Sequence, residues 1–239
     1  MSKSLLLLLV ISFSLVIQGC DKPKDKPATS EQATLPAKAA PAALPAPTPA
    51  TPEMIAKGEK LYQQNCVFCH QADAIGKPGF APSLTNPELL SVASPEFMKG
   101  TIRDGRAGTG MPPFAHLGKS GIDAIYAYIN SFAKLPNVSA AVDSQVVAQG
   151  DPRLGKLWYD QICSTCHGPA GNGYLAGGTG TAIGNASFLG KASDGFLRTT
   201  IKQGRSNTRM IGYDGPESMA DLADTEIDDI ITYLRSINQ

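Results

Sequence analysis

The hydrophobic residues of this 239-residue chain follow three different patterns along its length. An apolar run extends from Leu5 to Ile17, and a stretch rich in proline and alanine continues from there to about residue 51. Beyond it, apolar residues recur at helical spacing, and no alternating pattern of useful length indicates a strand. The pattern therefore predicts an all-α protein whose folded part begins near residue 52.

The folded part repeats one pattern twice, which is a strong indicator of domain organisation. His70 and His167 hold equivalent places, 97 residues apart. At an offset of 97 to 99 the repeat also pairs Gly58 with Gly155, Tyr62 with Tyr159, Phe97 with Phe196, Ile102 with Ile201, Arg106 with Arg205, and Met111 with Met210. We therefore predict two domains, residues 52–138 (the first copy) and 145–239 (the second copy).

Each copy is expected to form about three helices. The first helix begins at Thr51-Pro52 or Asp151-Pro152, where an N-cap residue precedes a proline at the first helical position. The second begins at Ser94 or Ser193 and ends at a glycine, the usual residue after a helix C-terminus. The third carries an apolar stripe, formed by Ile122, Ile125, Ile129 and Phe132 in the first copy and by Ile227, Ile230, Leu234 and Ile237 in the second.

The N-terminal apolar run has the layout of an export signal. It follows a positive residue, Lys3, and is too short to span a membrane comfortably. The stretch from Ile17 to Cys20 resembles a bacterial lipoprotein box, which implies a signal peptide over residues 1–19 and a lipid anchor on Cys20; an ordinary signal peptide with an incidental cysteine is the alternative. Asp21 after the lipidated cysteine resembles a signal for retention at the inner membrane, so we expect the protein on its periplasmic face.

Residues 20–51 form a Pro/Ala-rich linker that cannot bury enough apolar surface to offset the entropy of ordering. We expect a disordered tether between the membrane and the folded domains. The charges of the whole chain balance, with 21 Lys plus Arg against 21 Asp plus Glu. This balance gives no reason to expect nucleic acid as a partner, because nucleic acid requires a basic surface.

Four of the five cysteines lie in two strings, Cys66-Val67-Phe68-Cys69-His70 and Cys163-Ser164-Thr165-Cys166-His167. Two thiols at this spacing can form thioethers with the two vinyl groups of one haem, and the following histidine then supplies the proximal nitrogen to iron. A redox disulfide or half of a zinc site is the alternative for such a pair. We therefore expect two covalently bound haem c groups and no thiol left for a disulfide.

An iron used only for electron transfer takes a sixth ligand, and a methionine thioether raises its potential. Met111, in Gly110-Met111-Pro112, is the candidate in the first copy, with His116 as an alternative. Met210 is the aligned candidate in the second copy, although Ile211 replaces the proline. Met219 is the alternative there, so the sequence leaves the second distal ligand open.

The strings and the Met-Pro loop together resemble two tandem class I c-type cytochrome domains, as in dihaem cytochromes of bacterial respiration. The resemblance implies that Gly58 and Tyr62 cross the last helix near Tyr128, and that Gly155 and Tyr159 meet Tyr233. It also implies that the Pro82 carbonyl accepts a hydrogen bond from His70. No proline marks an acceptor for His167, and Arg106 and Arg205 are either partners of haem propionates or solvated.

The function that this resemblance implies is single-electron transfer in a bacterial respiratory chain, without catalysis. The partners are other redox proteins, and a quinol-oxidising or terminal oxidase complex is one expectation. The alternative is a dihaem oxidoreductase, such as a peroxidase or a sulfur-compound dehydrogenase. It would use the second haem, because the distal loop is less regular in the second copy.

Overall fold

The structure is a computed structural model that describes residues 50–216, 218 and 220–237. The signal peptide over residues 1–19, the lipidation site Cys20, nearly all of the linker, and Met219 lie outside the described residues. No helix in the described part is long and apolar enough to cross a membrane. The anchor and the limits of the domains therefore remain predictions.

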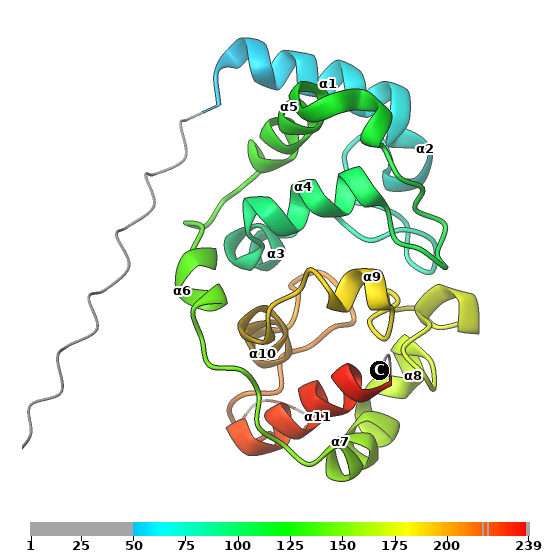
Figure 1. The fold of residues 1–239 in the computed structure, drawn as a ribbon, viewed down its shortest axis with the longest axis vertical. Helices are drawn as coiled ribbons and strands as arrows, with labels where there is room; N and C mark the ends of the chain where they lie inside the picture. The colour runs from blue at the N-terminus through cyan, green and yellow to red at the C-terminus, as the bar shows by residue number, and fades with distance from the viewer. Residues whose placement is uncertain (1–49, 217, 219, 238–239) are drawn as a thin grey trace, which may run out of the picture. The chain divides into compact units, whose positions relative to one another are not determined.

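The described residues form helices joined by loops, with a single isolated bridge between Lys77 and Ala81 in place of a sheet (Figure 1). The first copy contains α1 (Pro52–Asn65), α2 (Val67–His70), α3 (Pro87–Val92), α4 (Pro95–Asp104) and α5 (Gly118–Asn130). α6 (Ser139–Asp143) follows, and the second copy contains α7 (Pro152–Trp158), α8 (Ser164–His167), α9 (Ala186–Leu189), α10 (Asp194–Gln203) and α11 (Asp224–Ser236). The all-α prediction is confirmed.

The helices begin where the sequence predicted, because the expected capping residues satisfy their free backbone N–H groups. Ser94 accepts a hydrogen bond from the Phe97 N–H at the start of α4, and Ser193 does the same for Phe196 in α10. Thr51 and Asp151 cap α1 and α7, each before a proline. At the other end, Gly105 and Gly204 follow α4 and α10 with φ of 66° and 68°, a conformation that favours glycine.

Besides α2 and α8, which carry the second cysteine and the histidine of each string, three short α-helices of the described part were not predicted. α3 and α9 begin at Asn86 and Asn185, whose side chains cap them, and α6 lies in the segment that joins the copies. Helices of four to six residues are too short to show helical periodicity. The asparagine caps, 99 residues apart, were the signal that could have revealed α3 and α9.

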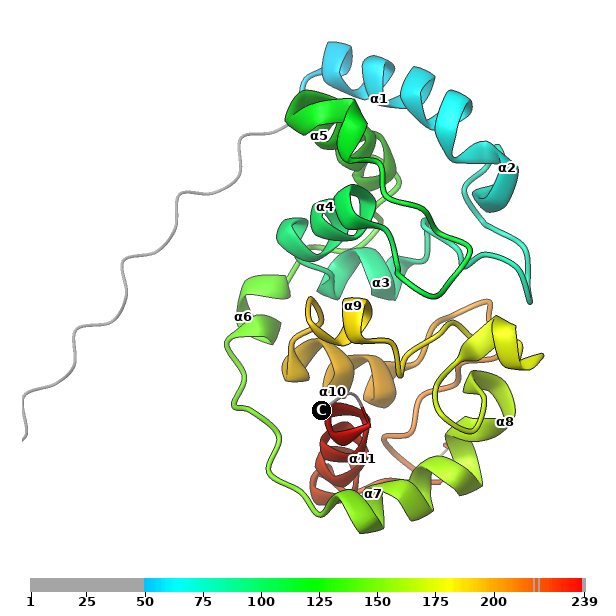
Figure 2. The ribbon, with the colours of Figure 1, turned by 45° about the vertical axis from the view of Figure 1, so that its right-hand side comes forward.

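The first and last helices of each copy lie across one another (Figures 1 and 2), and each crossing lies at a glycine. A Cβ atom added to Gly58 of α1 would lie 1.9 Å from the Ala124 carbonyl oxygen of α5, and one added to Gly155 of α7 would lie 1.9 Å from the Asp229 carbonyl oxygen of α11. Beside each crossing two tyrosine rings pack at 5.3 Å between centroids: Tyr62 with Tyr128 and Tyr159 with Tyr233. The crossings implied by the resemblance are confirmed.

The two copies meet through α3 and α4 on one side and α9 and α10 on the other (Figure 2). At the centre Phe97 stacks on Phe196, with ring centroids 4.8 Å apart, and Phe188 meets Phe97 edge-on at 6.0 Å. The contact is reciprocal: Asn86 Nδ2 donates to the Ser206 carbonyl at 3.0 Å, and Asn185 Nδ2 donates to the Ala107 carbonyl. Because both the donors and the acceptors are 99 residues apart, the interface has the approximate twofold character of a symmetric dimer.

Candidate haem sites

In each copy the two cysteines of the string lie on one helical turn. α1 ends at Asn65, and the chain turns through Cys66 into α2, which carries Cys69 and His70. In the second copy a π-helical turn, Tyr159–Cys163, leads into α8. None of these four sulfurs is in a disulfide. Each pair therefore presents two thiols and an imidazole within one turn, as attachment of haem c requires.

Burial sets the chemistry of the first thiol in each string. It raises the pKa of Cys66 to about 11, with a smaller contribution from Cys69. In the same way burial raises the pKa of Cys163 to about 12, and Cys166 adds to it. Without haem these sulfurs behave as neutral, packed groups, which differs from the exposed thiolate of a redox-active pair. The donor set fits two thioether bonds better than disulfide exchange.

His70 is fixed by a backbone carbonyl. Its side chain is 9 % exposed, and Nδ1 lies 2.9 Å from the Pro82 oxygen. Because a carbonyl can only accept, Nδ1 carries the proton and Nε2 keeps its lone pair for a metal. Burial lowers the pKa of His70, so the imidazole is neutral. The hydrogen bond implied by the resemblance is confirmed.

His167 has an equivalent partner that the sequence reading did not identify. Its Nδ1 lies 2.8 Å from the carbonyl oxygen of Thr181, which is 99 residues after Pro82. A backbone carbonyl accepts whatever its side chain is, so the lack of a proline was not informative, whereas the repeat offset was. Gly180 makes room for the ring, because a Cβ atom there would lie 2.8 Å from His167 Cε1 and Nδ1.

The loops that carry Met111 and Met210 have the same hydrogen bonds. In the first copy the Arg106 N–H donates to the Met111 carbonyl at 3.0 Å, and Thr109 Oγ1 accepts from the Met111 N–H at 3.2 Å. In the second copy the Arg205 N–H donates to the Met210 carbonyl at 2.6 Å, and Thr208 Oγ1 accepts from the Met210 N–H at 3.0 Å. The loop is therefore regular in both copies, despite Ile211.

The loop that follows is also conserved in geometry between the copies. The Phe114 N–H donates to the Ile102 carbonyl at 3.1 Å, and the Tyr213 N–H donates to the Ile201 carbonyl at 3.0 Å. His116, the alternative ligand of the first copy, is exposed on a turn of 3-10 helix. Beyond Tyr213 the offset between the copies rises from 99 to 105, so most of the additional residues of the second copy lie there.

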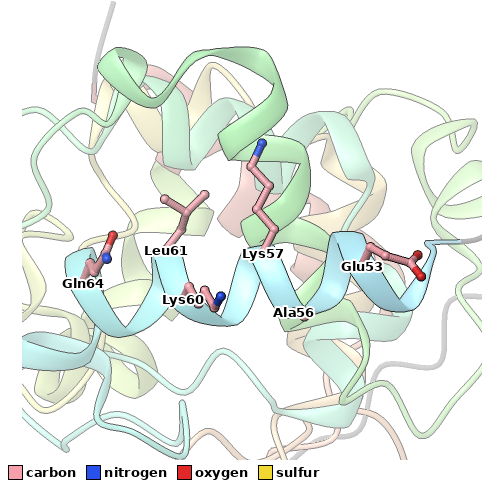
Figure 3. A pocket seen from close by; sticks show the side chains of 6 residues that line it. All are labelled: Glu53, Ala56, Lys57, Lys60, Leu61 and Gln64. Carbon is pink, nitrogen blue, oxygen red and sulfur yellow. The ribbon is translucent and has the colours of Figure 1, made fainter.

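An open, shallow depression lies along α1 (Figure 3), lined by Glu53, Ala56, Lys57, Lys60, Leu61 and Gln64. Its charges are mixed, and it includes no residue of the two strings.

Comparison with known proteins agrees with this description. The family described as cytochrome c oxidase, cbb3-type, subunit III matches residues 53–129, and the cytochrome c family matches residues 153–238. Each match includes one complete Cys-x-x-Cys-His string. The chain therefore has two cytochrome c domains and carries two haem c groups.

Several curated proteins are similar over both domains. The cbb3-type cytochrome c oxidase subunit CcoP of Rubrivivax gelatinosus is 31% identical over 188 residues, covering 79% of this chain and 56% of that protein. CcoP of Azospirillum sp. (strain B510) is 28% identical, with coverages of 64% and 53%. The cytochrome bc1 complex cytochrome c subunit of Mycobacterium leprae is 27% identical, with coverages of 77% and 62%. The chain spans a little over half the length of these relatives.

Among solved structures, a reducing HAO-like protein complex of Kuenenia stuttgartiensis is similar to 77% of this chain and 96% of that chain, at a TM-score of 0.47 and 20% identity. The two family matches and the geometry of the strings define the class: the protein is a dihaem c-type cytochrome. It is related to the cbb3-type cytochrome c oxidase subunit CcoP.

Proposed function

We propose that this protein is a one-electron carrier that delivers electrons to a cbb3-type terminal oxidase in a bacterial respiratory chain. The relationship to CcoP supports this choice of partner over a quinol-oxidising complex, although one relative is named as a bc1 complex subunit. No observation favours a catalytic role. The irregular second loop that suggested a peroxidase or a sulfur-compound dehydrogenase has the same hydrogen bonds as the first.

The observation that carries the proposal is the equivalence of the two iron sites. Each has a histidine whose Nδ1 is bound to a backbone carbonyl and whose Nε2 is free. Each also has a methionine at the same place in the same loop. We infer that His70 and Met111 ligate one iron and that His167 and Met210 ligate the other. An iron with both axial positions filled exchanges electrons without binding a substrate.

The same equivalence supports Met210 over Met219 as the second distal ligand. Met210 is held by Thr208 and Arg205 as Met111 is held by Thr109 and Arg106. Met219 lies outside the described residues. The thioethers are assigned to the string cysteines, Cys66 and Cys69 in one copy and Cys163 and Cys166 in the other.

The proposed location is the periplasmic face of the inner membrane. It rests on the lipoprotein-like box ending at Cys20 and on Asp21, and on the naming of relatives as oxidase subunits. A lipid anchor followed by a Pro/Ala-rich tether would keep the haem domains close to a membrane-bound oxidase. Confinement of this kind raises the effective concentration of a partner without a rigid contact.

A spectroelectrochemical titration of the purified protein tests the carrier assignment. We expect two low-spin one-electron centres, with two haems per chain by pyridine haemochrome assay. A high-spin centre in either copy would contradict it, because it would reveal an open iron position.

Mixing the reduced protein with a purified cbb3-type oxidase tests the partner. We expect rapid oxidation of both haems under oxygen and none when the oxidase is inhibited by cyanide. Oxidation no faster than with free oxygen alone would reject this partner and leave the carrier assignment intact.

A further inference from the structure

Arg106 is a half-buried cation with one side-chain donor, Nε, that has no acceptor among the described residues. Its Nε atom is excluded from solvent and makes no hydrogen bond, and no ion pair involves its guanidinium within the part of the chain that the structure describes. Burial lowers the pKa of Arg106 to about 10, so the group stays charged at neutral pH. A buried charge is costly unless an anion or several acceptors face it. The side chain is therefore poised for an anionic ligand.

The second copy holds this guanidinium in place. The Arg106 guanidinium carbon lies 4.4 Å from the ring centroid of Phe188, in a cation–π contact. Phe188 is 7 % exposed and packs against Phe97 and Phe196 at the centre of the interface between the copies. A residue of the first copy is thus oriented by a rigid aromatic group of the second.

Arg205, the equivalent residue of the second copy, differs in its partners. Its guanidinium donates to Thr200 Oγ1 at 2.8 Å and to the Gly204 carbonyl at 3.3 Å. Its contact with an aromatic ring, Phe196, is longer, at 5.7 Å. The two arginines therefore do not share one role, although the sequence aligns them, and only Arg106 has a buried donor without an acceptor.

The backbone of Arg106 places it beside the first haem site. Its N–H donates to the carbonyl of Met111, so the arginine and the proposed distal ligand belong to one loop. Haem c is itself a dicarboxylate, and its two propionates are the anions that it brings to this site. An arginine fork matches a carboxylate in geometry as well as charge.

We propose that Arg106 binds a propionate carboxylate of the haem in the first copy, and that Phe188 of the second copy is the positioning residue for this contact. The inference rests on the presence of two haems and deepens the proposed function. A fixed positive charge near the iron disfavours the ferric state, because ferric haem carries one more positive charge than ferrous haem. Arg106 therefore raises the potential of the first haem, and packing in the second copy controls that effect.

Redox titration of Arg106→Gln tests the proposal in the full-length protein. We expect the midpoint potential of the first-copy haem to fall while that of the second stays unchanged. The two centres are assigned with Met111→His, which displaces only the first. Arg103→Gln is the matched control, because it removes the same charge from an exposed side chain three residues earlier, in α4. Equal shifts in the two variants, or a shift of the second haem, would overturn the proposal.

Two further variants test the geometry. Arg106→Lys keeps the positive charge but loses the two parallel N–H donors of the guanidinium. We therefore expect the midpoint potential of the first haem to fall less than in Arg106→Gln. Phe188→Leu should lower the potential of the first haem although it lies in the second copy, and an unchanged first potential would exclude a positioning role. A haem stoichiometry of two in each variant separates these outcomes from failure to mature. Failure of the proposed function would appear in the unmodified protein as a high-spin centre.

Discussion

Replacement of Gly58 by alanine would force apart the helices that enclose the first haem site. The added Cβ would lie 1.9 Å from the Ala124 carbonyl oxygen and 2.9 Å from Tyr128 Cβ, whereas real Cβ atoms essentially never approach closer than 3.0 Å. The main obstacle is helix backbone, which cannot rotate away as a side chain can. α1 and α5 must therefore separate by about 1 Å in a tightly packed interior.

The expected loss of stability follows from this separation. Overpacking costs about 1–3 kcal/mol, and a backbone obstacle places this site at the upper end. The higher helix propensity of alanine relative to glycine offsets about 1 kcal/mol of this cost. The net loss is about 2 kcal/mol, which lowers the melting temperature of a domain of this size by roughly 8–16 °C. Separation also removes contacts of Tyr62, which is fully buried against Tyr128.

Thermal unfolding followed by far-ultraviolet circular dichroism measures this loss. Gly155→Ala should lower the melting temperature by a similar amount, because its Cβ would also lie 1.9 Å from a backbone oxygen, that of Asp229. Gly100→Ala is the control, because it lies within α4 and its Cβ would meet only the flexible end of Lys191, at 3.4 Å. We expect that control to melt at or above the wild-type temperature. If Gly58→Ala melts with the control, the close crossing of α1 and α5 is wrong.

Three other changes give separate expectations. Met111→His should keep both haems attached and lower the potential of one centre, because imidazole favours ferric iron more than a thioether does; redox titration curves identical to wild type would show that Met111 is not a ligand. Asn86→Ala should lower the free energy of unfolding by about 2 kcal/mol, because it removes the cap of α3 and the hydrogen bond to the Ser206 carbonyl. Asn86→Ser keeps a capping oxygen, so its free energy of unfolding should fall by about half as much, as measured by denaturant titration. Cys20→Ser should release a haem-loaded protein from the membrane fraction, and retention after a high-salt wash would mean that a protein partner holds it.

The sequence by itself determined the longer helices and the haem strings because both depend on local spacing. Ser94 and Gly105 bound a helix through groups within one turn of its ends. Cys66, Cys69 and His70 lie together on a single turn, so the sequence alone indicates the haem attachment that they support. The repeat added long-range information, since an offset of 97 or 99 residues indicated two equivalent sites.

Only the tertiary structure decided how the copies meet and which arginine has a buried donor without an acceptor. Phe97 and Phe196 were recognised as equivalent, but nothing local indicates that they stack on one another. The acceptor for His167 is a backbone carbonyl, which has no sequence signature. Arg106 and Arg205 look alike in the chain, yet one stacks on a ring of the other copy and one bonds within its own loop. Such differences arise from packing between segments distant in sequence, where no local pattern records which groups come together.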